Sequence, residues 1–532
     1  MAFLIKAGKM IVDNTNVTEI LGQLSTASEN ERTTIIEGVR PVLSTADGKR
    51  KYKASLENSD LTVVFDCLNA SGKAEIQAAS DILNQILDIV DPILALNRYH
   101  ASLTRCLHHP NPEVKVLAIR FLSKCLPSDQ CLEAMFSSDS LLIDAIKLIN
   151  DDEGNVAKEV KDFIYAMALM QGTEIKNEMP FVPPLLPLLQ EFLHHEKEVN
   201  RLRIEELMIA IAKLSPEMTQ RVASAGFLQR LCQEVLSDDI LVQLNAIEIL
   251  SDFAESRHGL IYLENKGVLK DMDNLLSQSS SSPMANYLLP GFIKFFGRVS
   301  RNHPTNFTEM YPNFTWIVFS VFTNNGIADS ELKHLAISTI GHISTTLEGK
   351  QKIASMDKKE NGIISKDLVN SLRYGSTNDK NVALSACRDI ISTPDDDNDG
   401  NVSSQISRDF YYGLIQSGLK DPVEYIFQII KQPFAEISEI AFNVLQNIGK
   451  YQWGIPLFVS QPGLLEYILD RNVASKKEAK EMKYILIKIL QENAASLNGD
   501  IMPSEMLMRL KKYVKEGAFH VEAQAEVALG EV

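Results

Sequence analysis

A chain of 532 residues is too long to form one compact core, so we expect either several domains or one extended array of repeats. Lys and Arg total 53 against 69 Asp and Glu, and the formal net charge of −16 argues against binding to nucleic acid or to an anionic membrane surface. This charge suits a basic partner surface, or it serves only to keep the protein soluble.

The N-terminal segment and the cysteines indicate a protein of a reducing compartment. Lys6 and Lys9 interrupt the apolar start of the chain, so it does not read as a signal peptide, and the densest apolar run, Trp316–Phe322, is too short to cross a bilayer. The six cysteines are scattered without any C-x-x-C pair, which predicts neither a disulfide framework nor a zinc site. We expect a cytoplasmic protein, and the nucleus stays open as a second location.

The most informative feature of the sequence is an internal repeat. Each repeat begins with a polar turn that leads into a helical pattern, and we call the first large apolar residue of that helix the anchor. The first four anchors are 42, 43 and 43 residues apart, a degenerate fifth follows after 42, and later separations stretch to 48, 50 and 55. In chain order the anchors are Val114, Val156, Val199, Val242, Met284, Leu332, Val382 and Ile437, and Ile76 is a candidate for an earlier one.

Apolar residues recur four and eight positions after most anchors, as in Val242, Ala246 and Leu250. These offsets lie on one face of a helix, where a central alanine lets a neighbouring helix approach closely. The third repeat has Arg203 in the alanine position, so it either packs differently or is aligned on the wrong residue. Units of this length are typical of HEAT or armadillo repeats. The sequence therefore predicts an all-α, HEAT/armadillo-like α-solenoid of superhelical repeats, and the alternative is a non-repetitive helical protein with evenly spaced helices.

We divide the chain into divergent N-terminal helical repeats over residues 1–105, an armadillo/HEAT-like repeat array over 106–515 and a C-terminal tail over 516–532. Within the array, Pro180–Pro184 should break one helix and start the next, which begins with the apolar run Leu185–Leu189. Ser277–Pro283 reads as a linker, and an acidic loop covers residues 393–404.

The acidic loop resembles the first half of a calcium-binding loop. Asp395, Asp397, Asp399 and Gly400 have the required spacing, but the twelfth position holds Ile406 in place of a bidentate glutamate, so we expect a solvated loop without calcium. No phosphate-binding loop, nucleophile elbow or metalloprotease motif occurs elsewhere. We therefore expect a protein that binds other proteins, with no enzymatic activity, no metal and no cofactor.

Positions six and ten residues after each anchor should face away from the packed seam and line the inner surface of the array. Most of these positions are polar, and the series changes from basic to acidic to neutral along the chain, which makes it a candidate surface for a basic partner helix. This predicted ladder consists of Arg120, Lys124, Asp162, Glu205, Glu248, Asp252, Ser338, His342, Arg388, Asn443 and Asn447. The simpler interpretation is a solvated inner face without a partner.

The segment Tyr287–Gly297 has the distinctive sequence YLLPGFIKFFG. Five other segments stand out beside it, namely His258–Val268, Leu347–Gln351, Gln432–Ile448, Gln461–Arg471 and Tyr513–Gly517. In their order along the chain, these segments resemble the family of non-ATPase regulatory subunit 5 of the 26S proteasome. The resemblance covers roughly residues 105–520, while the first hundred residues match weakly and residues 394–404 look like an insertion.

The resemblance implies a HEAT/armadillo-like assembly chaperone for the base of the 19S regulatory particle. Members of the family hold the C-terminal domain of one ATPase, regulatory subunit 7, in an intermediate that also contains the regulatory subunit 4 ATPase and non-ATPase subunit 2, and they leave before the mature proteasome forms. It further implies a monomer before partner binding. The alternative is an armadillo-type scaffold or adaptor unrelated to the proteasome.

Overall fold

The computed structural model describes residues 17–137, 141–195, 197–278, 285–304, 307–323, 330–397, 400–432, 435–473, 476–496 and 501–520. Over these residues it contains α-helices and short 3-10 helices and no β-strand, which confirms the all-α prediction. The chain forms two compact units, Met1–Gln233 and Glu234–Val532. The sequence-based division at residues 105 and 515 follows the strength of the resemblance and not compactness, and it stays a prediction.

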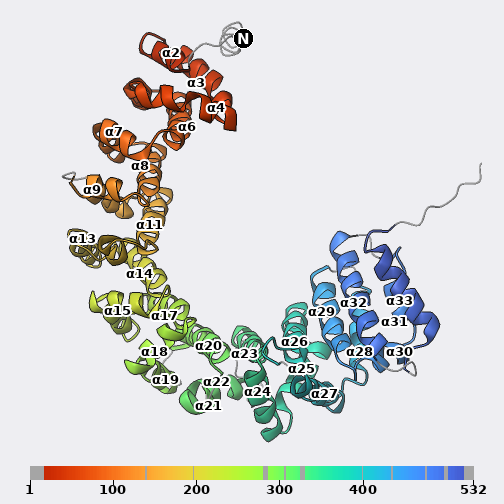
Figure 1. The fold of residues 1–532 in the computed structure, drawn as a ribbon. Coiled ribbons are helices and arrows are strands. Elements are labelled where there is room, and N and C mark those ends of the chain that lie inside the picture. Colours follow the sequence, from red (N-terminus) through yellow and green to blue (C-terminus); the bar gives the residue numbers. More distant parts are fainter. Residues whose placement is uncertain are drawn as a thin grey trace, which may run out of the picture. The chain divides into compact units, whose positions relative to one another are not determined.

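The first unit is a stack of short helices (Figure 1). In chain order they are α2 (Val17–Gly22), η1 (Gln23–Ser25), α3 (Glu29–Leu43), α4 (Ala46–Asn58), α5 (Thr62–Asp66), η2 (Cys67–Asn69), α6 (Lys73–Ile89), α7 (Pro92–Leu107), α8 (Pro112–Cys125), α9 (Asp129–Ser137), α10 (Leu141–Lys147), η3 (Leu148–Asn150), α11 (Gly154–Ala168), α12 (Glu174–Glu178), α13 (Leu185–Phe192), α14 (Glu198–Ala212), α15 (Pro216–Ser224) and α16 (Phe227–Glu234).

The second unit continues the pattern with longer helices. In chain order they are α17 (Ile240–Ala254), α18 (Arg257–Asn265), α19 (Val268–Gln278), α20 (Ala285–Asn302), α21 (Phe307–Met310), α22 (Pro312–Thr323), α23 (Ser330–Ile343), α24 (Leu347–Lys359), α25 (Ile363–Tyr374), α26 (Thr377–Ile391), α27 (Asn401–Gln416), α28 (Pro422–Ile430), α29 (Ala435–Lys450), α30 (Ile455–Ser460), α31 (Leu464–Leu469), α32 (Lys477–Ser496) and α33 (Ser504–Glu516).

The predicted anchors mark one layer of helices in each unit. Ile76 and the anchors from Val114 onward fall in the first part of a helix, while Met284 lies outside the described residues, immediately before α20. We call these helices the anchor layer: α6, α8, α11 and α14 in the first unit, and α17, α20, α23, α26 and α29 in the second. Within each unit every anchor-layer helix packs against the next one, which confirms the solenoid.

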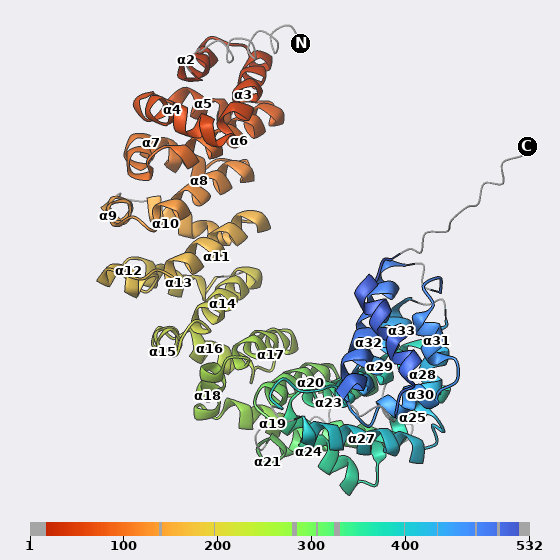
Figure 2. The ribbon, with the colours of Figure 1, turned by 45° about the vertical axis from the view of Figure 1, so that its right-hand side comes forward.

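The remaining helices form a second layer behind the anchor layer. In the first unit, both views place α6, α8, α11 and α14 along one side and α7, α9 and α15 along the other (Figures 1 and 2). In the second unit, α24 packs on α23, α25 on α26 and α28 on α29, and Figure 1 shows all three below the row of α23, α26 and α29. Each repeat therefore offers one face of an anchor-layer helix to solvent and buries the opposite face.

Polar turns start the anchor-layer helices, as the sequence predicts. The Asp239 side chain accepts a hydrogen bond from the amide of Leu241 at 2.9 Å and so caps α17. Asn111 caps α8 in the same way, with 2.9 Å to the amide of Glu113. These caps satisfy amide groups that have no partner within the helix, and they fix the starts of α17 and α8. Helices α6, α11 and α14 begin without a side-chain cap.

The core is the seam between the two layers. Val114, Ala118 and Leu122 are fully buried, and the alanine at offset four is buried in the repeats that start at Val242, Leu332, Val382 and Ile437. At about 1.5–3 kcal/mol for each buried large aliphatic side chain, this seam is the main favourable contribution to the folding of each repeat. The helix that follows the proline cluster also forms as predicted: α13 begins at Leu185, and both Leu185 and Leu189 are buried.

No described helix is long and apolar enough to pass through a membrane.

Candidate functional site

The exposed face of the anchor layer carries most of the predicted ladder. Six of its side chains are solvent-exposed, namely Arg120, Lys124, Asp162, Glu248, Asp252 and Ser338. Three more are half-buried, namely His342, Arg388 and Asn443. The offsets of six and ten residues from each anchor therefore select surface positions in most repeats, because the period of the helix returns them to the face opposite the seam.

The third repeat is the exception, and the structure resolves its alignment. The side chain of Val199, the predicted anchor, is 60% exposed, while the next residue, Asn200, is buried together with Ile204 and Met208 at offsets of four and eight. Arg203 fits beside this seam because it donates hydrogen bonds to the backbone carbonyls of Ile149 and Asp151, at 3.0 and 2.8 Å. The predicted anchor Val199 is therefore wrong by one residue.

Because of this shift, Glu205 does not face solvent. Only 3% of Glu205 is exposed, and its carboxylate lies 3.5 Å from the guanidinium of Arg230 on α16. Its neighbour Glu206 is exposed and pairs with Lys161 of α11 at 2.9 Å. The correct solvent-facing residue of this repeat is Glu206, and the prediction that Glu205 lines the surface is wrong.

Asn447 is also buried, at 9% exposure. Its side-chain amide donates a hydrogen bond of 2.9 Å to the backbone carbonyl of Arg388 on the preceding anchor-layer helix. This contact ties α29 to α26, so Asn447 holds two repeats together and is not available to a partner. A buried amide that reaches a helix-end carbonyl is a stabilising use of a polar side chain.

Ion pairs between successive anchor-layer helices engage several ladder residues. Arg120 pairs with Glu159 of α11 at 3.0 Å, and Lys124 pairs with Asp88 of α6. In the second unit, Glu248 lies 3.8 Å from Arg298 of α20. Exposed pairs of this kind contribute about 0–1 kcal/mol each, so they align neighbouring repeats more than they stabilise them.

Helix α20 contributes surface residues that the sequence analysis did not assign to the ladder. The exposed residues on one face of this helix are Tyr287 and Lys294, followed by the half-buried Arg298. Lys294 stands ten residues after the degenerate anchor Met284 but was not included in the ladder, and Tyr287 and Arg298 fall outside the offsets of six and ten. The available signal was the segment Tyr287–Gly297 itself, which stands out in the resemblance but had not been placed on a helix face.

Helices α17 and α20 form the clearest mixed apolar and charged surface of the described anchor layer. A Cβ atom at Gly291 would lie 3.3 Å from the Leu244 side chain, and Arg298 donates to the hydroxyl of Ser251 at 3.1 Å. The two contacts occur in the same order along both helices, so the helices run in the same direction, and Leu241 and Tyr287 lie at the same end.

This surface is apolar at one end and carries charges of both signs at the other, where Glu248 and Asp252 of α17 lie across from Lys294 and Arg298 of α20. Leu241 and Tyr287 are 67% and 69% exposed, and the carboxylates of Glu248 and Asp252 follow along α17. We call Leu241, Glu248, Asp252, Tyr287 and Lys294 the α17–α20 face. Large exposed apolar side chains next to carboxylates are typical of a surface that binds protein.

Toward the C-terminal end the ladder is close to neutral. Burial, together with the nearby Arg301, lowers the pKa of His342, so this imidazole stays uncharged at neutral pH. Arg388 pairs with the adjacent carboxylate of Asp389 at 2.8 Å. The strongest acidic character of the predicted ladder in the second unit therefore belongs to α17.

The acidic loop is used for helix capping over its described part. Asp396 accepts a hydrogen bond from the amide of Leu347 at 3.0 Å, and Asp397 accepts from the amides of Gly400 and Ser403 at 3.1 and 3.0 Å. A hydrogen bond from the Ser403 hydroxyl, with those from the amides of Ser403 and Gly400, lowers the pKa of Asp397 and places its charge at the start of α27. Among the described residues, no three His, Cys, Asp or Glu side chains are grouped to hold a metal ion.

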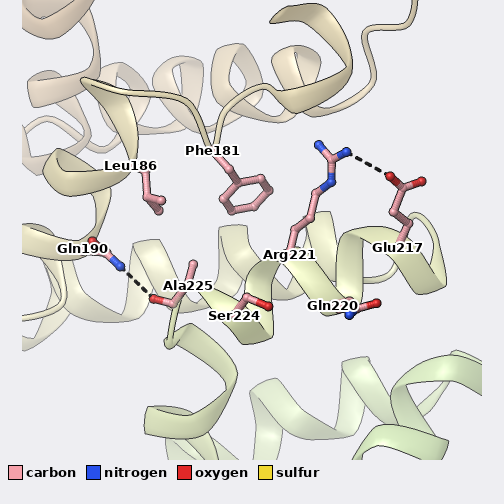
Figure 3. Close-up of a pocket in the computed structure, with 8 residues that line it drawn as sticks. All are labelled: Phe181, Leu186, Gln190, Glu217, Gln220, Arg221, Ser224 and Ala225. Atoms are coloured by element: carbon pink, nitrogen blue, oxygen red, sulfur yellow. Dashed lines mark hydrogen bonds and ion pairs between the residues drawn. The ribbon is translucent and has the colours of Figure 1, made fainter. Parts of the chain in front are cut away.

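A groove on the second layer of the first unit lies between the proline-rich segment and α15 (Figure 3). It has a volume of about 460 Å³, and Phe181 and Leu186 line it. Arg221 pairs with Glu217 at 2.9 Å, and Gln190 donates to the carbonyl of Ala225 at 3.0 Å, as the dashed lines in Figure 3 show. Because these polar side chains satisfy one another, they do not point to a particular ligand.

Comparison with known proteins provides an independent line of argument. The model of the family described as proteasome non-ATPase 26S subunit matches residues 18–531. The 26S proteasome non-ATPase regulatory subunit 5 of Bos taurus is 26% identical over 467 residues, which cover 88% of this chain and 90% of that protein. The protein of the same name from Homo sapiens is 26% identical over 472 residues, and the one from Drosophila melanogaster is 24% identical over 494.

Among solved structures, importin beta is similar with a TM-score of 0.56 and 13% sequence identity, over 96% of this chain and 69% of that chain. At this identity the likeness concerns the fold alone. It agrees with an array of helical repeats.

Proposed function

Because this chain belongs to the proteasome non-ATPase 26S subunit family, we propose that it is an assembly chaperone for the base of the 19S regulatory particle. In this role it binds the C-terminal domain of a base ATPase, regulatory subunit 7, in an intermediate with the regulatory subunit 4 ATPase and non-ATPase subunit 2. It leaves before the mature proteasome forms. The proposal rests on the match of the family over nearly the whole chain and on relatives that carry the name of a proteasome regulatory subunit.

The observation that carries the binding role is the α17–α20 face. It combines two large exposed apolar side chains, Leu241 and Tyr287, with the carboxylates of Glu248 and Asp252 on two helices that pack together. Apolar side chains of this size give affinity when a partner covers them, and the flanking carboxylates select a partner surface with basic residues. We propose this face, in place of the full ladder with Glu205 and Asn447, as the main contact.

Co-purification tests the proposal. The full-length chain is mixed with the isolated C-terminal domains of the base ATPases, and retention is compared for wild type, Tyr287→Ala and the double variant Glu248→Lys/Asp252→Lys. We expect Tyr287→Ala to weaken binding about tenfold, and the double variant to weaken it and to reduce its dependence on salt.

A matched control is Asp271→Lys, which reverses an exposed carboxylate on α19 of the second layer and should leave retention unchanged. If no base ATPase domain is retained by the wild-type chain, the chaperone proposal fails, and a scaffold unrelated to the proteasome becomes the better interpretation. If the ATPase domain is retained equally by all variants, the chaperone role stands but the α17–α20 face is not the contact.

We further propose that the chain acts by binding and not by catalysis, as a monomer before it meets its partner, in the cytoplasm with access to the nucleus. Light scattering on the purified chain tests the monomer, and imaging of a tagged chain tests the location. The exposed apolar and charged residues of the anchor layer support a binding role, because such residues can contact a partner surface without any reactive group.

A further inference from the structure

A groove on the second layer of the second unit is distinct from the α17–α20 face. It lies between α24, α25 and α27 and has a volume of about 710 Å³. This volume falls within the range of about 300–1,000 Å³ that is usual for binding pockets. None of the predicted ladder residues lines it.

The floor of the groove is apolar. Ile353 and Ile364 are buried beneath it, and Ile406 and Phe410 stand half-exposed one helical turn apart on α27. Ala354 on α24 leaves room opposite them. A pocket of this shape suits one large apolar side chain, since a single anchor residue in a desolvated pocket often contributes most of the affinity of a peptide.

The rim carries positive charge in a chain whose net charge is −16. Lys358 and Lys366 are exposed on the rim, and neither forms an ion pair in the part of the chain that the structure describes. Two carboxylates also line the groove. Asp357 is committed to the start of α25, since it accepts from the amide of Ile364 at 2.8 Å and from the hydroxyl of Ser365 at 3.1 Å.

The other carboxylate, Asp409, accepts a hydrogen bond from Gln405 at 2.8 Å on the surface of α27. Burial raises the pKa of Asp357, while its hydrogen bonds from Ile364 and Ser365 oppose that rise. The two lysines are therefore the charges that an incoming group would meet on the α24 and α25 side. The exposed amide of Gln416 can hydrogen-bond to a backbone on the α27 side.

We propose that this groove binds a short acidic segment of another protein, with one large apolar side chain inserted over Ile406 and Phe410 and with carboxylates facing Lys358 and Lys366. The apolar floor excludes a simple anion as a sufficient ligand, because a phosphate or sulfate would leave the floor uncovered. Two rim lysines are too few for a nucleic-acid backbone, which requires an extended basic surface. The inference does not depend on the proposed function, because the groove and the α17–α20 face are built from different helices.

The proposal is tested by selection from a library of random short peptides displayed on phage, with the full-length chain as bait. Peptides that also bind Lys358→Glu/Lys366→Glu are discarded. The remaining peptides should share an excess of Asp and Glu around one Leu, Ile, Phe or Tyr. A labelled copy of the most enriched peptide is then measured by fluorescence anisotropy, and its affinity for Lys358→Glu/Lys366→Glu should fall about tenfold or more.

Two further variants make the measurement specific. Ala354→Trp places an indole over the floor and should abolish binding without changing the charge of the chain. Lys270→Glu/Lys511→Glu makes the same change of charge at exposed lysines on α19 and α33 and should leave affinity unchanged. The proposal is overturned if no peptide depends on the groove, or if those that do lack an acidic excess. It is equally overturned if sedimentation shows a self-association that Lys358→Glu/Lys366→Glu removes, since the occupant is then a second copy of this chain.

Discussion

The close approach of α20 and α23 at Gly297 allows a quantitative test of the packing in the anchor layer. A Cβ atom at Gly297 would lie 2.8 Å from the Cγ2 of Thr339, closer than side chains tolerate. Thr339 is buried, and its branched side chain has little freedom in a helix. At Gly291, one and a half turns earlier on the same helix, the nearest atom is 3.3 Å away at the tip of the Leu244 side chain, which can move.

The two positions should therefore respond differently to the same substitution. Gly→Ala within a helix gains about 1 kcal/mol of intrinsic helix propensity. At Gly297 this gain is offset by about 1–3 kcal/mol of overpacking against Thr339, so Gly297→Ala should be neutral to destabilising by about 2 kcal/mol. Gly291→Ala should stabilise by about 0.5–1 kcal/mol. We expect a difference of about 2 kcal/mol between two substitutions that are identical in chemistry.

The assay combines urea unfolding, followed by circular dichroism, with hydrogen exchange of the peptides that cover α20 and α23. Hydrogen exchange is needed because repeat arrays do not unfold in a single step. Thr339→Ala removes the clashing methyl group, so the pair Gly297→Ala/Thr339→Ala should recover at least about 1 kcal/mol relative to the sum of the single variants. The reasoning is refuted if Gly297→Ala is as stable as Gly291→Ala, or if the double variant shows no recovery.

Three further predictions test other parts of the structure. Asp273 is buried and accepts hydrogen bonds from the amides that start α22. Asp273→Ala should therefore lower the free energy of unfolding by about 2–3 kcal/mol and speed amide hydrogen exchange in α22, while the isosteric Asp273→Asn should retain part of the protection from exchange. Equal effects of the two substitutions would contradict a capping role. The corrected alignment of α14 predicts that Val199→Ala changes the free energy of unfolding by less than about 0.5 kcal/mol, whereas Ile204→Ala lowers it by about 2–4 kcal/mol. If thermal melts show that Val199→Ala is the less stable variant, Val199 is the anchor after all. Burial lowers the pKa of Lys350 from 10.5 to about 7, so between these pH values the unfolded chain binds a proton that the folded chain lacks. The free energy of unfolding should therefore rise with pH across this window more steeply in wild type than in Lys350→Met. Parallel curves would show that the amine is not neutral in the folded state.

The repeats could be predicted from the sequence because their signal is local. A polar turn, an anchor and an alanine four residues later all lie on one helix, and the same order recurs in repeat after repeat. Those features also fix which helices belong to the anchor layer, since successive anchors start successive helices of one row. The fold and the order of the helices therefore follow from spacing alone.

The surface was harder to predict, because it depends on contacts between helices. An exposed valine and a buried asparagine stand side by side at Val199 and Asn200, and hydrophobicity alone selects the wrong one. The buried asparagine has partners at both ends of its amide, because Arg203 donates to its side-chain oxygen at 3.2 Å and its nitrogen lies 3.4 Å from the ring of His195. Likewise, the burial of Glu205 depends on Arg230, which approaches from a different helix.

The α17–α20 face shows the same limit. Tyr287 lies near the start of a helix whose anchor is degenerate, and only the parallel packing of α17 and α20 brings it to the same end of the surface as Leu241. The two residues are more than forty positions apart in the sequence, so the periodicity within a single helix cannot predict that they share one surface.

In each unit, close packing between neighbouring anchor-layer helices is supplemented by lateral polar contacts, such as Lys161 with Glu206 or Asn447 with the carbonyl of Arg388. Each repeat of such an array contacts only its neighbours, so the stiffness of the array is distributed over many interfaces. We therefore expect small rotations between successive repeats to add up. Within each unit, the exposed face of the anchor layer could then adjust its curvature to that of a partner surface. Added salt screens the lateral ion pairs, so it should increase the flexibility between neighbouring repeats.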